Sequence, residues 1–489
     1  MKNTNYFVKI VAFIAFIESY YIYSEPVSRK GLDFLFIVPL FFAFCILIFG
    51  KKIIPYHKHG FGLKIYYFIV IIRYVVQPFL IVISHGKLNF RMPEASASDY
   101  PVAILIYCIE LTIACIVIQK WHPIYIKKYQ IKEKFEKEIV LNIYGKGILV
   151  VYFLFLLIRS SSWIPGMNIL NIKESTSDIT VVFDATIFNC LKVFIFIFFL
   201  IKAKKNSKNI DRFKTYFLIA IIAGLFNFLT FFGSNRSFIY ETSIATIAIF
   251  IYSFPQYKKG LSLVLLPFAI VLMFGTYVTK QFGTDNGLTI ATENTLTVAS
   301  NIVEEYSNGL WTVAKSYQSS IGLSSSTSAE AFVKDISNGF SGLSDLPGFK
   351  TINKELYGLR SSSDIFKGSL KQDDDRGQML SLSGGFLIIG GELFGWIFLF
   401  LGNYLMIMLL VNMEVESKTT NDCYYKYMYI WMSILMGLVH CYCLQTIIFC
   451  WSKFILFYWI VLYFNKLGLQ KNNYKIISAL PNFRNKPFV

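Results

Sequence analysis

The sequence predicts an all-α polytopic membrane protein with about twelve transmembrane helices and one large loop outside the membrane. Of its 489 residues, 55% are hydrophobic and the mean hydropathy is +0.52, which is more apolar surface than a soluble protein of this size could bury. Long runs with few charges recur, such as residues 148–158 and 191–201, and a span needs about 20 mostly apolar residues. Lysine and arginine concentrate in alternate loops, as is typical of membrane proteins.

The apolar runs and the cations together predict the topology. The predicted spans are residues 5–23, 32–50, 61–84, 100–120, 141–159, 180–201, 213–232, 237–254, 260–279, 384–411, 424–446 and 448–466. The loops with most cations, which we place in the cytoplasm together with both termini, are 51–64, 120–146 and 202–214. The first apolar stretch lacks a small-residue cleavage site, so we interpret it as an uncleaved span. The predicted regions are spans one to nine (1–279), a large extracytoplasmic loop (280–383), spans ten to twelve (384–466) and a cytoplasmic tail (467–489).

Composition also argues against several function classes. The formal net charge of +17 is explained by the topology of the loops, so no nucleic-acid partner is expected. Seven of the eight cysteines fall in predicted spans and Cys423 falls in a predicted cytoplasmic loop, so no disulfide framework is expected. No CxxC pair indicates a redox or metal site. The chain has neither a P-loop nor a dinucleotide fingerprint, and no cofactor is expected.

The large loop is polar but not featureless. It runs for about 100 residues, too long for a passive connection, and is rich in Ser, Gly, Asn and Thr. Residues 302–320 have apolar and aromatic side chains at helical spacing, among them Tyr306 and Tyr317, which predicts short amphipathic helices on the membrane surface. Residues 324–336 begin with Ser and Thr that favour a helix N-cap.

A single cation lies in the short turn GSNRS between two apolar runs. Arg236 is at the outer face, where it could simply reach toward lipid phosphates. The sharper hypothesis is an anion site: Gly233 and Ser234 allow a ligand to approach the backbone, and the helix that begins after Asn235 contributes partial positive charge. Glu241 follows inside the span, and a carboxylate within a membrane usually has a partner or a function.

Further candidates lie in and beside the large loop. Arg360 and Arg376 could converge with Arg236 on one anionic group, because the guanidinium fork binds two oxygens of a pyrophosphate at once. Lys280, at the end of span nine, is a further candidate cation. Asp364 is a candidate general base for a sugar hydroxyl. Glu392 lies near the outer end of span ten, and its glycine neighbours allow a kink or close packing there.

Metal and histidine chemistry are not expected. The run Asp373–Asp375 resembles a metal site but is more typical of a solvated patch beside a balancing cation. His85 ends span three, and His440 is interpreted as a buried histidine whose ring nitrogens are satisfied. The large loop contains no histidine, which argues against a Ser-His-Asp mechanism there.

Three stretches of the sequence resemble one family. GSNRS after an apolar span is similar to a glycine-serine-arginine turn, YSNGLWTVAKSY (306–317) is similar to the start of a large external loop, and residues 376–403 resemble the return of that loop into the membrane. Together with the topology, these features resemble the Wzy-type oligosaccharide repeat-unit polymerases, which join lipid-linked repeats into O-antigen or capsular polysaccharide. The absence of a loop histidine distinguishes the chain from the related lipid A-core ligases.

The resemblance implies a fold, a substrate and roles. It implies a GT-C-like helical architecture in the bacterial cytoplasmic membrane, with undecaprenyl-diphosphate-linked oligosaccharide as substrate and membrane lipids, a flippase and a chain-length regulator as partners. Arg236 would hold the diphosphate and stabilise it as it leaves, while a loop carboxylate activates the acceptor hydroxyl and no metal is needed. The resemblance also assigns substrate contacts to Ser237, Tyr306 and Tyr317.

Three other functions remain open from the sequence. A lipid-linked oligosaccharide flippase would place cations in a central cavity and have short loops, which the large loop argues against. Another external glycosyl- or acyltransferase is also open; an acyltransferase would be expected to have a histidine near its active cavity, and His440 is the only histidine predicted in the middle of the membrane. A structural subunit of an envelope complex would depend on Arg236 for assembly rather than for turnover.

Overall fold

The fold was analysed in a computed structural model, which describes residues 2–25, 27–53, 60–88, 92–133, 141–164, 167–169, 179–232, 236–257, 295–340, 343, 351–352, 356, 358–370 and 380–479. These residues form a helical bundle with one two-stranded ribbon. Predicted span nine, the turn residues Gly233, Ser234 and Asn235, and the loop residues Lys280 and Arg376 lie outside the described residues, as does the run Asp373–Asp375.

The first half of the chain runs up and down the bundle. Its helices are α1 (Lys2–Ser24), α2 (Ile37–Ile53), α3 (Phe61–Ile71), the π-helical turn η1 (Ile72–Val76), α4 (Gln77–Ile83), α5 (Asp99–Glu133), α6 (Ile143–Ile158), α7 (Ser160–Trp163), α8 (Ile179–Lys205), α9 (Ile210–Leu229), α10 (Arg236–Ser253) and the 3-10 turn η3 (Pro255–Tyr257). Strands β1 (Met167–Ile169) and β2 (Thr230–Phe232) pair antiparallel, with Asn168 opposite Phe231. The ribbon therefore replaces the last three residues of predicted span seven, just before the GSNRS turn.

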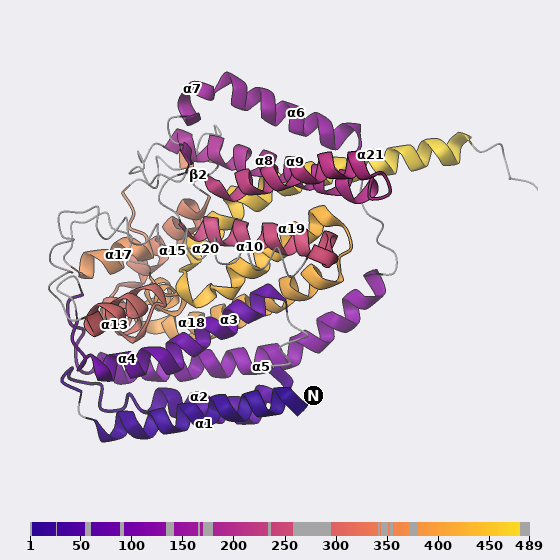
Figure 1. The fold of residues 1–489 in the computed structure, drawn as a ribbon. Coiled ribbons are helices and arrows are strands. Elements are labelled where there is room, and N and C mark those ends of the chain that lie inside the picture. The colour runs from indigo at the N-terminus through magenta and orange to yellow at the C-terminus, as the bar shows by residue number, and fades with distance from the viewer. Residues whose placement is uncertain are drawn as a thin grey trace, which may run out of the picture.

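The second half begins with the polar segment. Its helices are α13 (Thr295–Tyr306), α14 (Leu310–Ser320), α15 (Ser325–Gly339), α17 (Ser362–Ser369), α18 (Leu382–Thr419), α19 (Cys423–Gly437), the 3-10 turn η5 (Val439–Cys441), α20 (Leu444–Cys450), the π-helical turn η6 (Trp451–Ile455) and α21 (Leu456–Ala479). Figure 1 shows α13, α15 and α17 at one end of the bundle, while the N-terminus and the projecting part of α21 lie at the opposite end. We call helices α13, α14, α15 and α17 the cap.

Length and composition identify this fold as an α-helical membrane protein. Four helical stretches of the described chain are long and apolar enough to cross a membrane, and they correspond to predicted spans three, four, six and ten: Phe61–Ile83, Asp99–Tyr129, Phe183–Lys205 and Leu382–Thr419. Shorter apolar helices lie within predicted spans two, five, eight and twelve. Large apolar side chains such as Phe13, Val151 and Leu393 are exposed on the bundle, as expected of surfaces that face lipid.

Helix α18 is a hairpin. Gly391 has φ 59° and ψ −162°, so the helix breaks there into the arms Leu382–Gly390 and 392–419. The Asn403 side-chain amide donates to the Ser383 hydroxyl at 2.9 Å, which shows that the two arms run side by side. Glycine is needed at the break because L-residues rarely adopt this positive φ. The kink predicted from the glycines beside Glu392 is therefore confirmed.

Replacing Gly402 with alanine is expected to destabilise the hairpin by about 1–3 kcal/mol, because a Cβ at this position would overlap the ring of Phe386. The matched control is Gly147→Ala on α6, where the added Cβ meets nothing within 4 Å. The measurement is the thermal unfolding midpoint of each purified variant in detergent. Equal midpoints for the two variants would show that the arms of α18 are not in this contact.

Three predictions of local structure are wrong. The break between predicted spans eleven and twelve lies at residues 438–443, because α19 ends at Gly437 and the turn η5 follows. Cys423 is the first residue of α19 and is fully buried, rather than part of a loop. Helix α14 does not lie on the membrane surface: its residues from Leu310 to Ser316 are buried against α5 and α18, because it fits between them.

Candidate functional site: a buried charge centre beneath the cap

An arginine lies near the middle of the span Phe61–Ile83. Arg73 belongs to η1, the π-helical turn that joins α3 to α4, and its side chain is completely buried. Turns of this kind interrupt helices and are frequent at functional sites. The guanidinium Nη1 lies 2.9 Å from Oε2 of Glu110 on α5, whose side chain is 1% exposed. The two spans thus hold an ion pair where neither charge reaches solvent.

Side chains from the start of α18 and from the turn η5 also contact the carboxylate of Glu110. The Ser383 hydroxyl, at the start of α18, donates to its Oε1. Nδ1 of His440, in the turn η5, lies 3.7 Å from its Oε2, and Nε2 of the same ring lies 3.0 Å from the Tyr66 hydroxyl. The predicted burial of His440 is confirmed, but among the described residues only its Nε2 has a hydrogen-bond partner, so the prediction that both ring nitrogens are satisfied is wrong. We call Arg73, Glu110, Ser383 and His440 the charge centre.

The cap reaches down to this centre. The Arg73 Nη2 donates to the backbone carbonyl of Asn308 at 3.3 Å, and its Nε donates to the Tyr107 hydroxyl at 3.3 Å. Asn308 adopts a left-handed backbone with φ 49°, which turns the chain sharply between α13 and α14. Its own side-chain amide is buried and has no hydrogen-bond partner among the residues that the structure describes. A polar turn of the cap is therefore seated inside the apolar bundle, next to a fixed cation.

A second buried ion pair fastens the cap nearer its edge. Arg29, between α1 and α2, lies 3.1 Å from Glu304 on α13, and the two side chains are 2% and 0% exposed. Glu304 also accepts the backbone N–H of Trp311 at 2.9 Å, and Arg29 donates to the carbonyl of Gly86 at 2.8 Å. Buried charges need such partners because each costs several kcal/mol to remove from water. The two pairs therefore fix α13 and the start of α14 relative to the bundle.

This arrangement suits recognition of an anion inside the helical bundle, beneath the cap. Arginine stays charged in any environment and presents its donors in a planar fork, so it can exchange a carboxylate partner for a phosphate. Within the described part of the chain, no group of three His, Cys, Asp or Glu side chains is placed to hold a metal ion. The donor set thus offers cationic and hydrogen-bonding chemistry.

The predicted anion site around Arg236 falls at the start of a helix. Arg236 and Ser237 are the first two residues of α10. Glu241, one turn later, is completely buried, and neither of its carboxylate oxygens has a hydrogen-bond partner within the described part of the chain. Nearby on α8, the buried Lys192 donates to the carbonyl of Thr230 on β2 at 2.6 Å. Strand β2, which leads into the GSNRS turn, is therefore held by Lys192, a cation that the sequence analysis did not single out.

The predicted loop residues are spread over the cap. Arg360 is exposed, and Glu392 is exposed at the start of the long arm of α18. Asp364 is engaged in a capping box: its carboxylate accepts the N–H and the hydroxyl of Ser361 at 2.9 and 2.6 Å, while the Ser361 hydroxyl accepts the N–H of Asp364. Tyr306 is 38% exposed at the end of α13. These residues do not gather at the charge centre.

Tyr317 is a partly buried residue of α14, and its ring lies 6.4 Å from that of Trp396, centroid to centroid. It therefore packs the cap against the long arm of α18. The contact with Trp396 gives Tyr317 a structural role. The substrate contact that the resemblance implies for Tyr317 stays a prediction.

The charge centre itself was missed from the sequence. Its signal was present, because Arg73 and Glu110 are charged residues inside predicted spans three and four, and such residues are rare and usually functional. Nothing in the sequence pairs them, since the pairing depends on how the spans pack. The ion pair of Arg29 and Glu304 joins residues 275 positions apart, and no pattern in the sequence indicates it.

Comparison with known proteins adds no assignment: neither protein-family models nor curated proteins nor solved structures give a match to this chain.

A buried carboxyl group in the cap gives a pH-dependent prediction. Asp335 on α15 accepts the backbone N–H of Ser362 at 2.9 Å and its hydroxyl at 2.5 Å. Burial raises the pKa of Asp335 to about 6, because desolvation outweighs these two hydrogen bonds. Between about pH 4 and pH 6 the folded state therefore holds a proton that the unfolded state has released, and stability falls as the pH rises through this window.

We expect Asp335→Asn to remove this pH dependence and to stabilise the protein at pH 7.5 by about 1–3 kcal/mol, since the amide carries no charge to desolvate. The test compares thermal midpoints in detergent from pH 4.5 to 7.5. Glu330→Gln, an exposed change on the same helix, is the control and should follow the wild type. The same slope for Asp335→Asn and wild type would contradict the prediction.

Proposed function

We propose that this protein is a membrane glycosyltransferase of the oligosaccharide repeat-unit polymerase type. It joins undecaprenyl-diphosphate-linked oligosaccharides at the outer face of the bacterial cytoplasmic membrane. The proposal includes twelve spans in a GT-C-like arrangement, cytoplasmic termini, and the cap on the outer side. A flippase that delivers the repeats and a regulator of chain length are its proposed partners.

One observation carries the proposal most strongly. A polar cap is seated on an apolar bundle, and its Asn308 turn meets the intramembrane Arg73 at 3.3 Å. A lipid-linked oligosaccharide is divided in a matching way: its apolar tail suits the apolar bundle, its anionic diphosphate suits the arginine, and its polar glycan suits the cap. The opposite placement of the cap and of the N-terminus in Figure 1 supports the same orientation.

In the proposed reaction, arginines hold the diphosphate of the donor and stabilise it as the leaving group. Arg236 at the start of α10 has the main role, with Arg360 and Arg376 as further contacts. An acceptor hydroxyl attacks the anomeric carbon from the face opposite the diphosphate and inverts it, while a carboxylate takes the hydroxyl proton. Glu392 is exposed and open to this role, whereas Asp364 would first have to release its capping contacts with Ser361.

A second candidate function is supported by a different observation. Arg73 lies near the middle of a span rather than at its outer end, as expected of a lipid-linked oligosaccharide flippase that carries an anion across the membrane. In this alternative the pairing with Glu110 is the resting state, and the diphosphate replaces the carboxylate during transport. The large cap favours the polymerase.

The decisive experiment mixes purified protein with lipid-linked repeat units from its own host and resolves the products by length. A polymerase gives a ladder, which we expect to disappear in Arg236→Ala and to fall at least tenfold in Arg236→Lys, because lysine cannot bind two oxygens in one plane. Lys127→Gln, an exposed change at the far end of α5, is the control. A ladder unchanged in both Arg236 variants would remove Arg236 from the site.

The flippase alternative is tested with the same protein in sealed vesicles. Movement of a lipid-linked repeat between leaflets without a ladder, lost in Arg73→Gln, would favour transport over polymerisation. A ladder without such movement would exclude it.

A further inference from the structure

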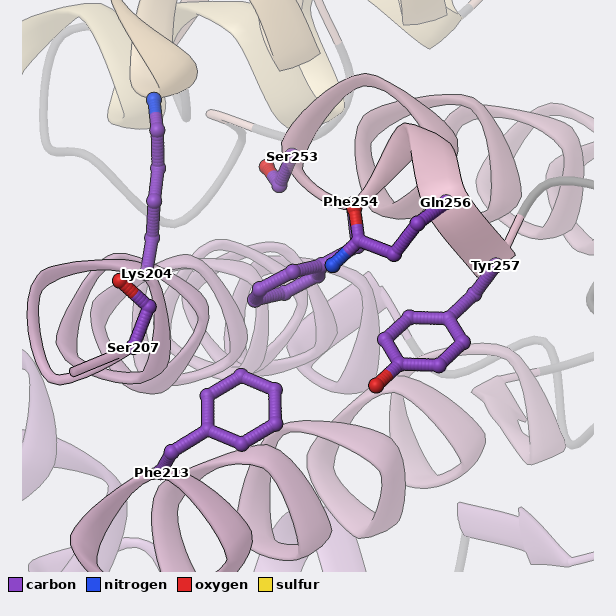
Figure 2. A pocket seen from close by; sticks show the side chains of 7 residues that line it. All are labelled: Lys204, Ser207, Phe213, Ser253, Phe254, Gln256 and Tyr257. Atoms are coloured by element: carbon purple, nitrogen blue, oxygen red, sulfur yellow. The ribbon is translucent and has the colours of Figure 1, made fainter. Parts of the chain in front are cut away.

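A cavity of about 340 Å³ lies at the end of the bundle away from the cap, between the α8–α9 turn and the end of α10. Figure 2 shows the rings of Phe213, Phe254 and Tyr257 around the hollow, with Lys204 and Ser207 on its other side. Ser253 and Gln256 complete the lining. Among the described residues no acidic side chain lines the cavity, and its polar lining consists of the Lys204 side chain, the hydroxyls of Ser207, Ser253 and Tyr257, and the Gln256 amide.

Local contacts hold the walls in place. Asn209 caps α9 by accepting the N–H of Arg212 at 3.2 Å, which keeps the turn after α8 short. The ring of Phe217 packs against Phe254 and Tyr257 with centroids 5.1 and 5.4 Å apart. The cavity is thus built from packed aromatic rings on two helices, and it does not depend on a loose loop.

The charge around the cavity is strongly positive. The segment 202–214 contains one carboxylate, that of Asp211, and six cations: Lys202, Lys204, Lys205, Lys208, Arg212 and Lys214. All of these cations except Lys204, which lines the cavity, are exposed. Such a concentration of cations at the end of membrane helices attracts anionic lipid at about 1 kcal/mol per cation.

An apolar stripe lies on the face of α9 opposite Phe213 and Phe217, outside the cavity. Leu218, Ile222 and Phe226 follow each other at intervals of four residues and are 58%, 58% and 43% exposed. Side chains four apart lie on one face of a helix, so they form a continuous strip toward the middle of the membrane. This face of α9 is therefore suited to contact lipid acyl chains, and the cations around the cavity lie at the end of the same helix.

We propose that this cavity binds an anionic phospholipid. The phosphodiester lies among the lysines, the polar headgroup contacts Ser207 and Gln256, and the acyl chains extend into the surrounding bilayer. A free phosphate would have no use for the aromatic walls, and a neutral lipid would gain nothing from the cations. The proposal is independent of the catalytic assignment, because the cavity lies at the end of the bundle opposite the cap.

The test uses native mass spectrometry and thermal stability of the full-length protein in detergent, with phosphatidylglycerol, phosphatidylcholine or inorganic phosphate added. We expect phosphatidylglycerol to bind at least fivefold more tightly than phosphatidylcholine and to raise the thermal midpoint. Lys204→Gln should weaken phosphatidylglycerol about fivefold, consistent with the loss of one cation near an anionic headgroup. Inorganic phosphate should not compete at millimolar concentration.

Two further variants separate the cavity from general surface charge. Ser207→Trp, at an exposed position of the rim, should fill the hollow and abolish the preference for phosphatidylglycerol while the midpoint without lipid is unchanged. Lys127→Gln removes an exposed cation elsewhere and should bind like the wild type. Equal affinity for the two lipids, equal binding by Ser207→Trp and wild type, or displacement by inorganic phosphate would each overturn the proposal.

Discussion

Replacing Arg73 with methionine is expected to lower the free energy of unfolding by about 3–5 kcal/mol, because it leaves Glu110 buried without its cation. The chain length and shape of the side chain are largely kept, so the loss reports charge and hydrogen bonds rather than a cavity. The carbonyl of Asn308 would also lose its donor. The measurement is thermal unfolding of the purified protein in detergent.

A double-mutant cycle identifies the cause of this loss. Glu110→Gln combined with Arg73→Met removes both charges, so the pair should be less destabilised than Arg73→Met alone. If the double variant is at least as unstable as the sum of the two single variants, the ion pair does not account for the effect. If Arg73→Met costs under about 1 kcal/mol, Arg73 is not buried as the structure describes.

Replacing Glu304 with alanine is expected to have a similarly large effect, about 3–5 kcal/mol, but confined to the cap. The change leaves Arg29 buried without a counter-charge and the backbone N–H of Trp311 without an acceptor. Because the contacts within α5, α8 and α9 are untouched, the bundle should stay folded while α13 and α14 detach.

Limited proteolysis measures this local effect. New cleavage within residues 295–320 of Glu304→Ala, together with a nearly unchanged melting of the remaining helices, is the expected result. Glu330→Ala, an exposed change on α15, is the matched control and should be cleaved like the wild type. Cleavage spread equally over the whole chain of Glu304→Ala would show that the pair supports the bundle as a whole.

The class of protein and much of the helical framework follow from the sequence because apolar run length is a local property. The helical stretches Phe61–Ile83 and Asp99–Tyr129 coincide with predicted spans for that reason. The break at Gly391 could also be predicted from the sequence, since adjacent glycines mark it. By contrast, the pairing of Arg29 with Glu304 and the burial of α14 depend on contacts between distant segments, which no local pattern encodes.

The candidate site shows the same limit. Arg236 was singled out because one cation between two apolar runs is conspicuous, and its role stays a prediction. Arg73 and Glu110 are equally unusual within their spans, but their meaning came from the structure, where a π-helical turn and the Asn308 turn of the cap bring them together. An intramembrane charge deserves the same weight in a sequence as one at the boundary.

The hairpin in α18 has a consequence for biogenesis. At about 1.5 Å per residue, the arm Leu382–Gly390 is about 13 Å long, under half of the about 30 Å hydrocarbon layer. Such an arm cannot be delivered by the insertion machinery as an independent segment. It enters the bilayer only once the longer arm is in place, because the Asn403 amide on that arm supplies a hydrogen bond to the Ser383 hydroxyl. Insertion of the short arm is therefore a late step that follows insertion of the arm 392–419.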